Sequence, residues 1–223
     1  MVEAALYPRY AQPRLAEALA DSPVVLLHGP RQCGKTTLAR QMGERAGYAY
    51  FSFDDVVTLA AATEDPVGFV GDLPARTILD EVQRAPQLFT TLKSAVDRRR
   101  TAGRFLLTGS ANVLLLPHLA DSLAGRMEIL RLHPLAQAEL ARTPPDFLDA
   151  LFRRAFKTRT RPRLAKDLPA RITAGGYPAA LARSSPQRRA AWYRDYIETL
   201  VQRDVRDLAR ISALDALPRL LAL

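Results

Sequence analysis

Residues Gly29–Thr36, GPRQCGKT, carry glycines, a lysine and a threonine at the spacing of a phosphate-binding loop. Glycines let successive backbone amides turn toward phosphate oxygens, and a helix that begins at the loop adds its positive N-terminal end. Lys35 is then expected to reach the β- and γ-phosphates, and the Thr36 hydroxyl to ligate Mg²⁺. The pattern therefore predicts a loop that binds ATP together with Mg²⁺.

The predicted nucleotide-binding residues are Gly29, Pro30, Arg31, Gln32, Cys33, Gly34, Lys35, Thr36 and Thr37. The chain has four lysines beside 28 arginines, so a chance match to the pattern is expected on the order of once in a thousand. A glycine turn that only caps a helix is the alternative. Cys33 is expected to be a small neutral filler, and the alternative is an oxidation-sensitive thiol whose pKa is lowered at a helix N-terminus.

Two acids follow an apolar run in the segment ILDEV, residues 78–82. Asp80 is expected to end a buried strand and to hold Mg²⁺ through water, whereas Glu81 is expected to polarise the attacking water as a base. Acids where a strand emerges into solvent are the alternative, which the phosphate loop disfavours. The adjacent glutamate also argues against small-molecule kinases, since they need no water-activating base.

Two further groups are candidates for the catalytic machinery. Ser110, after the run RFLLTG, is the first choice for a side chain that orients water, with Thr108 and Asn112 behind it; a simple turn around Gly109 is the alternative. Arg126, in SLAGR, is expected to stabilise γ-phosphate charge in its own site or in a neighbour's. An ordinary surface arginine is the alternative reading of Arg126.

Short apolar runs alternate with helical patterns along the first part of the chain. Strands are expected at 24–28, 48–53, 77–82, 104–110 and 126–132, and helices at 9–20, 35–46 and 86–100. This alternation predicts an α/β fold with a parallel, doubly wound sheet whose ligand binds at the carboxyl ends of the strands. Residues 134–223 are expected to be all helical, with helices separated by the breaks TPP, RPR, GGYP and SSP.

The composition favours a soluble cytoplasmic protein without a membrane partner. Nearly half of the residues are hydrophobic, 48%, yet no stretch approaches the about 20 apolar residues of a membrane span, and the N-terminus carries no secretion signal. The lone cysteine excludes an internal disulfide, and His28, His118 and His133 are too scattered for a metal triad.

The net charge of +9 leaves two interpretations open. Basic patches at residues 97–100, 153–163 and 187–189 can contact nucleic acid such as DNA, but a solvated basic face is the favoured interpretation. The apolar pattern SALDALPRLLAL at 212–223 stops without a polar cap. We therefore expect either a fragment of a longer protein or a partner that covers this end.

Several motifs in series carry a resemblance to a known family. LLHGPRQCGKTTLARQ, TILDEVQRAPQLFTTLKSAVD, RFLLTGSAN, SLAGR and HPLAQAEL follow one another as in prokaryotic AAA-type ATPases with an AAA_14 domain joined to a DUF4143 domain. AGGYPAAL and WYRDYIETLVQRDVRDLARI resemble the next stretch of those proteins. The resemblance covers nearly the whole chain.

The resemblance implies a three-layer P-loop NTPase core with a parallel sheet over residues 1–133. Over residues 134–223 it implies a helical lid region and the start of a winged-helix segment, followed in the longer proteins by a domain similar to restriction-type nucleases. It implies phosphate and metal binding by Gly34, Lys35 and Thr36, a second acidic motif at Asp80 and Glu81, a polar sensor at Ser110 and a γ-phosphate sensor at Arg126. The chain stops at Leu223, where the winged helix is expected to begin, so a C-terminally truncated member is expected.

The function expected from the sequence is hydrolysis of Mg-ATP to ADP and phosphate, coupled to an unknown process that can involve DNA. One alternative is a nucleotide-dependent switch that docks a protein or DNA partner with negligible turnover. The other is a phosphotransferase. A homo-oligomer, in which Arg126 acts on a neighbouring copy, is an open alternative to a monomer.

Overall fold

The computed structural model describes residues 6–110, 113, 123–143, 147–153 and 167–201. The chain divides into two compact units, Met1–Thr158 and Arg159–Leu223, and each is considered by itself. The boundary between core and lid predicted at residues 133 and 134 falls inside the first unit and stays a prediction.

A five-stranded parallel sheet forms the centre of the first unit. Its strands are β1 (Val24–His28), β2 (Ala49–Ser52), β3 (Thr77–Asp80), β4 (Phe105–Gly109) and β5 (Met127–Arg131), in the spatial order β2-β3-β4-β1-β5. Every residue of β1, β3 and β4 is buried. Strands buried on both faces need helices on both sides of the sheet.

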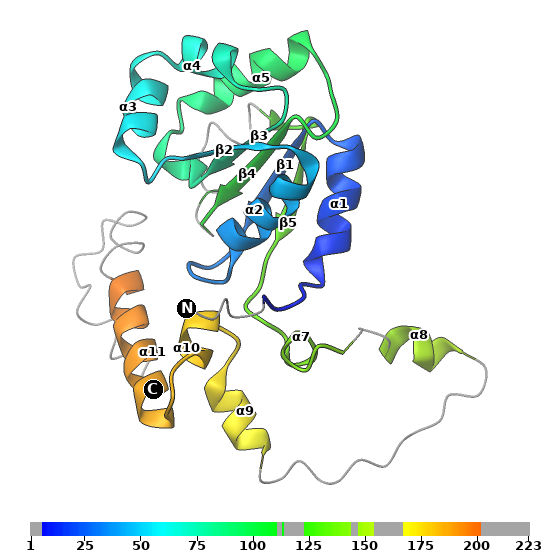
Figure 1. The fold of residues 1–223 in the computed structure, drawn as a ribbon, viewed down its shortest axis with the longest axis vertical. Coiled ribbons are helices and arrows are strands. Elements are labelled where there is room, and N and C mark those ends of the chain that lie inside the picture. The colour runs from blue at the N-terminus through cyan, green and yellow to red at the C-terminus, as the bar shows by residue number, and fades with distance from the viewer. Residues whose placement is uncertain (1–5, 111–112, 114–122, 144–146, 154–166, 202–223) are drawn as a thin grey trace. The chain divides into compact units, whose positions relative to one another are not determined.

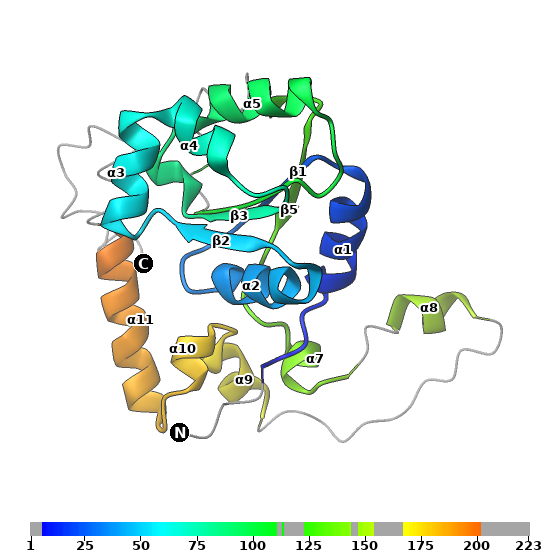
Figure 2. The same ribbon diagram turned by 45° about the horizontal axis from the view of Figure 1, so that its top comes forward.

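Two layers of helices supply that cover (Figures 1 and 2). Helices α1 (Ala11–Asp21) and α2 (Lys35–Ala46) pack on one face, where the core includes Ile78 and Leu106. Helices α3 (Val56–Glu64), α4 (Pro66–Asp72) and α5 (Leu88–Arg98) pack on the other, where the core includes Leu79 and Leu107. Alternate residues of each strand face opposite layers, which confirms the predicted three-layer α/β fold.

Helices α3 and α4 were absent from the sequence prediction. Both begin at an aspartate: Asp55 accepts a hydrogen bond from the Thr58 amide, and Asp65 accepts one from the Gly68 amide. The first helix is apolar nearly all round, with Val56 about three-quarters exposed, so it lacks the one-sided periodicity by which helices are recognised. The N-cap aspartates were the signal that could have shown these two helices.

The described elements after β5 are all helical, as predicted. They are α7 (Gln137–Leu140), α8 (Phe147–Phe152), α9 (Leu168–Ala174), α10 (Pro178–Leu181) and α11 (Pro186–Leu200). In the second unit, α11 stacks Trp192 on Tyr196 at 5.0 Å between ring centroids, and both rings contact Tyr177 at the start of α10. The apolar pattern at 212–223 and most of the basic patch at 153–163 lie outside the described residues. Among the described helices, none combines the length and the apolar character that crossing a membrane requires.

Candidate nucleotide-binding site

The parallel sheet brings the predicted site residues to one edge. The carboxyl ends of parallel strands lie together, so the phosphate loop after β1, the acids at the end of β3 and Ser110 after β4 share that edge. Strand β4 lies between β1 and β3. Ser110 therefore follows the strand that separates the loop from the acid pair, which is the position required of a side chain that orients water between them.

The phosphate loop depends on its two glycines. A Cβ on Gly29 would lie 2.1 Å from the Leu132 carbonyl oxygen, and Gly34 has a φ of +99°, which side chains rarely permit. Lys35 is 5% exposed, and its Nζ donates to the carbonyl oxygens of Gly29 at 3.1 Å and Pro30 at 3.0 Å. The loop thus curls around a buried cation at the N-terminus of α2, as phosphate binding requires.

The loop is anchored to the chain just after β5. The Leu132 amide donates to the His28 carbonyl oxygen at 2.7 Å, and the Cys33 thiol donates to the Leu132 carbonyl oxygen at 3.5 Å. Cys33 is fully buried, and desolvation raises the pKa of its thiol. The alternative of a thiol with a lowered pKa is therefore wrong, because burial outweighs the cations and backbone amides nearby. Burial likewise lowers the pKa of His28.

Asp80 lies directly opposite the start of α2. The Thr36 hydroxyl donates to its Oδ1 and Oδ2 at 3.1 and 3.0 Å. Two further hydroxyls reach the same carboxylate: Tyr50 donates to Oδ2 at 2.7 Å, and Thr108 donates to Oδ1. Asp80 is 3% exposed, and these three donors compensate the cost of burying its charge. Burial and the bond to Asp80 raise the pKa of Tyr50 to about 12.

Glu81 turns away from Asp80 through an unusual backbone torsion. Its φ of +59° is in the left-handed region, as is that of Gln32 in the phosphate loop, also at +59°. This torsion ends β3 at Asp80, two residues before the predicted end. Gln83, in the short 3-10 turn Val82–Arg84, donates from Nε2 to the Glu81 carboxylate and accepts from the Ser110 amide at 3.2 Å. One side-chain amide therefore links Glu81 to Ser110, while Asn112 lies outside the described residues.

Arg126 is not brought to the phosphate loop of its own chain. It precedes β5, and the pairings Val24↔Met127 and His28↔Arg131 place it at the amino edge of the sheet, about 17 Å of strand away from the loop. There it forms an ion pair with Asp97 of α5, 2.5 Å from Nε to Oδ1, and this hydrogen bond lowers the pKa of the Asp97 carboxyl. Arg126 was predicted to stabilise γ-phosphate charge either in its own site or in that of a neighbouring copy. The role in its own site does not fit this geometry.

The phosphate loop also contacts a buried ion pair that was not predicted from the sequence. Arg9, ahead of α1, donates from Nη1 to the Cys33 carbonyl oxygen at 2.8 Å and pairs with Glu139 of α7 at 3.3 Å. The second carboxylate oxygen of Glu139 accepts from the Ala136 amide at 2.8 Å. Both charged side chains are less than 10% exposed. The segment before α1 and the segment after β5 are thereby joined to the phosphate loop.

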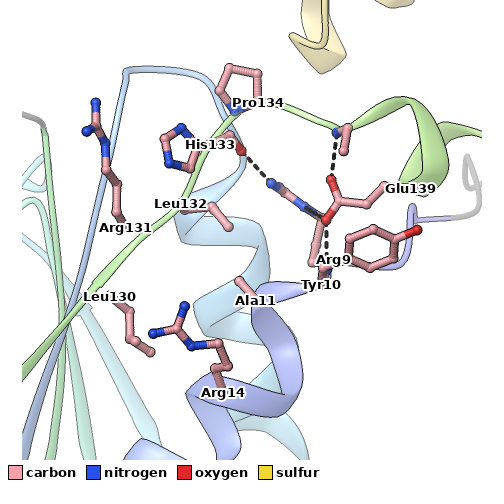
Figure 3. Close-up of a pocket in the computed structure, with 11 residues that line it drawn as sticks. Arg9, Tyr10, Ala11, Arg14, Leu130, Arg131, Leu132, His133, Pro134 and Glu139 are labelled. Atoms are coloured by element: carbon pink, nitrogen blue, oxygen red, sulfur yellow. Dashed lines mark hydrogen bonds and ion pairs between the residues drawn. The ribbon is translucent and has the colours of Figure 1, made fainter. Parts of the chain in front are cut away.

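Arg9, Ala136 and Glu139 also line a cavity of about 350 Å³, together with residues from the start of α1 and from the end of β5 (Figure 3). Figure 3 shows Arg9, Tyr10 and Arg14 on one side and the chain from Leu130 to Pro134 opposite them. The cavity is lined mainly by apolar atoms, with arginine side chains at its margin. Its volume lies near the lower end of the range of small-molecule sites.

Removing Arg9 is expected to cost stability. Arg9→Met leaves Glu139 as an unpaired buried charge, which destabilises proteins by about 3 kcal/mol or more. The exposed pair Arg84–Asp54, with side chains 35% and 68% exposed, provides the matched control, since Arg84→Met is expected to cost less than about 1 kcal/mol. Urea unfolding measures both values. Equal losses in the two variants would contradict a structural role for the buried pair.

Sequence reasoning missed Tyr50, Gln83, Arg9 and Glu139. Gln83 follows the acid pair by two residues, and that proximity was a usable signal. The other three act through contacts between distant segments, since Arg9 and Glu139 are 130 residues apart. No local pattern marks such a pair in a chain with so many arginines.

The fold and this edge of the sheet define the class of protein: a P-loop ATPase. Among solved structures, the Walker-type ATPase PABY2304 of Pyrococcus abyssi is similar, with a TM-score of 0.52 and 16% identity over 93% of this chain and 77% of that chain. Residues 21–141 match the family model AAA_14, described as an AAA domain. The chain belongs to this family, which confirms the AAA-type ATPase membership predicted from the motifs.

Two longer relatives are similar to this chain over most of its length. The uncharacterized proteins Mb2031c of Mycobacterium bovis and Rv2008c of Mycobacterium tuberculosis are each 36% identical over 206 residues, or 92% of this chain. The chain spans 41% of their length. Residues 165–223 match a model described as a domain of unknown function, DUF8612. That match does not support the DUF4143 membership which the resemblance had implied.

Proposed function

We propose that this chain binds Mg-ATP and hydrolyses it to ADP and phosphate. The main support is the contact between the phosphate loop and the acid pair. The Thr36 hydroxyl lies 3.0 Å from the Asp80 carboxylate. A buried lysine cation suits phosphate oxygens, and hydroxyl and carboxylate oxygens are the ligands that Mg²⁺ prefers. The residues present therefore fit both the nucleotide and the metal.

The roles proposed within this site follow from position. Gly29, Gly34 and Lys35 hold the phosphates, and Thr36 with Asp80 holds Mg²⁺, which when bound neutralises phosphate charge. Glu81 takes a proton from water as that water attacks, and Gln83 keeps the Glu81 carboxylate oriented while it contacts the Ser110 amide. Ser110 stays a proposed water-orienting residue. The cavity beside Arg9 has room for the base of the nucleotide.

Arg126 is proposed to act on a neighbouring copy. Its side chain is 29% exposed at the amino edge, and its bond to Asp97 would have to open before it reached a phosphate in another chain. The proposal therefore includes a homo-oligomer as the form in which Arg126 stabilises transition-state charge. Contact of this chain with DNA, and the process that the hydrolysis serves, stay open within this proposal.

A phosphate-release assay tests the proposal. The chain with ATP and Mg²⁺ is expected to release free phosphate slowly, on a scale of minutes per turnover, and chelation of Mg²⁺ with EDTA is expected to stop the release. The same assay is run with and without DNA. Tight nucleotide binding without release in either condition would support the nucleotide-dependent switch, and transfer of labelled γ-phosphate to an acceptor would support the phosphotransferase.

A further inference from the structure

We propose that Tyr50 is a positioning residue for the metal-binding acid Asp80 and that it sets the Mg²⁺ requirement of nucleotide binding. Its hydroxyl donates to Asp80 Oδ2 at 2.7 Å from the adjacent strand β2. The inference rests on the function proposed above and extends it to a residue outside the phosphate loop and the acid pair.

The Asp80 carboxylate is held by hydroxyls from three different elements. Thr36 comes from α2, Tyr50 from β2 and Thr108 from β4. Each of these side chains donates one proton to a carboxylate that is 3% exposed. Donors on both oxygens fix the rotation of the carboxylate about its Cβ–Cγ bond. Its orientation is thereby determined before a metal binds.

The three hydroxyls that donate to Asp80 are expected to differ in whether they keep this hydrogen bond once a metal is bound. The Thr36 oxygen is the proposed metal ligand, so its contact with Asp80 changes on binding. Thr108 contacts Oδ1, and its oxygen also accepts from the Glu81 amide at 3.2 Å, which ties it to the backbone after β3. Tyr50 is then the donor that continues to hold Oδ2.

The Tyr50 ring is itself held in place by α2. The Arg40 guanidinium lies over the ring, with its carbon 4.9 Å from the ring centroid. Arg40 follows Thr36 by four residues, so both side chains project from the same face of α2. Tyr50 therefore contacts both α2, which carries the proposed metal ligand Thr36, and Asp80. A shift of α2 is expected to change the orientation of the Asp80 carboxylate through Tyr50.

The strand pairing shows that this contact is not needed to assemble the sheet. Backbone pairing between β2 and β3 runs from Ala49↔Thr77 to Ser52↔Asp80. Tyr50→Phe keeps this pairing and the ring under Arg40, and it removes only the hydroxyl. The substitution thus isolates the orientation of Asp80 from the packing of β2.

The experiment measures ATP affinity by calorimetry in EDTA and across a Mg²⁺ titration, using the full chain. In Tyr50→Phe the affinity in EDTA is expected to stay within about twofold of the unsubstituted chain, whereas the Mg²⁺ concentration at half-effect is expected to rise roughly tenfold, as for the loss of one hydrogen bond to a charged group. Tyr48→Phe is the matched control. Tyr48 also lies under an arginine, Arg76, but its hydroxyl donates to the Gly103 carbonyl oxygen at 2.6 Å, away from Asp80.

A double-mutant cycle with Asp80→Asn separates positioning from packing. In the Asp80→Asn background, Tyr50→Phe is expected to produce no further change in the Mg²⁺ requirement. An unchanged half-effect concentration in the single variant, an equal loss of affinity with and without Mg²⁺, or additive effects in the cycle would each overturn the role of Tyr50. If the unsubstituted chain bound ATP without any response to Mg²⁺, the proposed metal site itself would fall.

Discussion

Replacing Lys35 with alanine is expected to weaken ATP binding by at least about 100-fold, equivalent to two charge-assisted hydrogen bonds to phosphate. Lys35 is 5% exposed, and its ammonium donates to the Gly29 and Pro30 carbonyl oxygens. It therefore shapes the loop and supplies the cation that phosphates need. Calorimetric titration with ATP and Mg²⁺ measures the loss.

Two comparisons separate the charge of Lys35 from its effect on the fold. Lys93→Ala, in α5, removes a lysine from another face of the same unit and is expected to leave the affinity unchanged. Lys35→Arg keeps the charge but replaces a compact ammonium by a planar fork, so it is expected to bind more weakly than the unsubstituted chain. Undiminished affinity in Lys35→Ala would remove the loop from the nucleotide site.

The second large effect concerns turnover. Glu81→Gln is expected to bind ATP with nearly unchanged affinity and to lose phosphate release by about 10²- to 10⁴-fold, the usual contribution of a general base. The substituted amide oxygen can still accept the hydrogen bond from Gln83, so the local conformation is expected to persist. Single-turnover release of labelled phosphate, measured beside calorimetric binding, distinguishes chemistry from affinity.

Glu64→Gln is the control for this variant. Glu64 is an exposed acid of α3 on the opposite layer from the loop, and its loss is expected to change neither binding nor turnover. Unchanged turnover in Glu81→Gln would exclude Glu81 as the base. A loss of ATP binding would instead make Glu81 part of the binding site.

The fold was largely predictable because its signals are local. Strand β1 and helix α2 begin and end at the predicted residues, Val24–His28 and Lys35–Ala46, since proline and glycine bound them in the sequence. The sheet order also places Asp80 and Ser110 beside the loop, as the alternation of strands and helices implied. These features follow from hydrophobic patterning and from the shared edge of a parallel sheet.

The remaining part of the site depends on contacts between segments far apart in sequence. Tyr50 looks like one of several aromatic residues in a strand, and only the pairing of β2 with β3 brings its hydroxyl to Asp80. For Arg126 the opposite holds: a local motif predicted that it lies in the site, but the register of β5 places it at the other edge of the sheet from the loop. Local motifs identify residue types, but strand order and register decide which residues meet.

The left-handed torsions at Gln32 and Glu81 are both unfavourable for residues with a Cβ atom. Each stores roughly 1 kcal/mol or more of conformational strain that the surrounding core must offset. Gln32→Gly would relieve this strain, but it would also increase the conformational entropy of the unfolded chain by a comparable amount, so the stability is expected to change little. The contacts around the loop and around the end of β3 therefore maintain two backbone angles that Gln32 and Glu81 by themselves would rarely adopt.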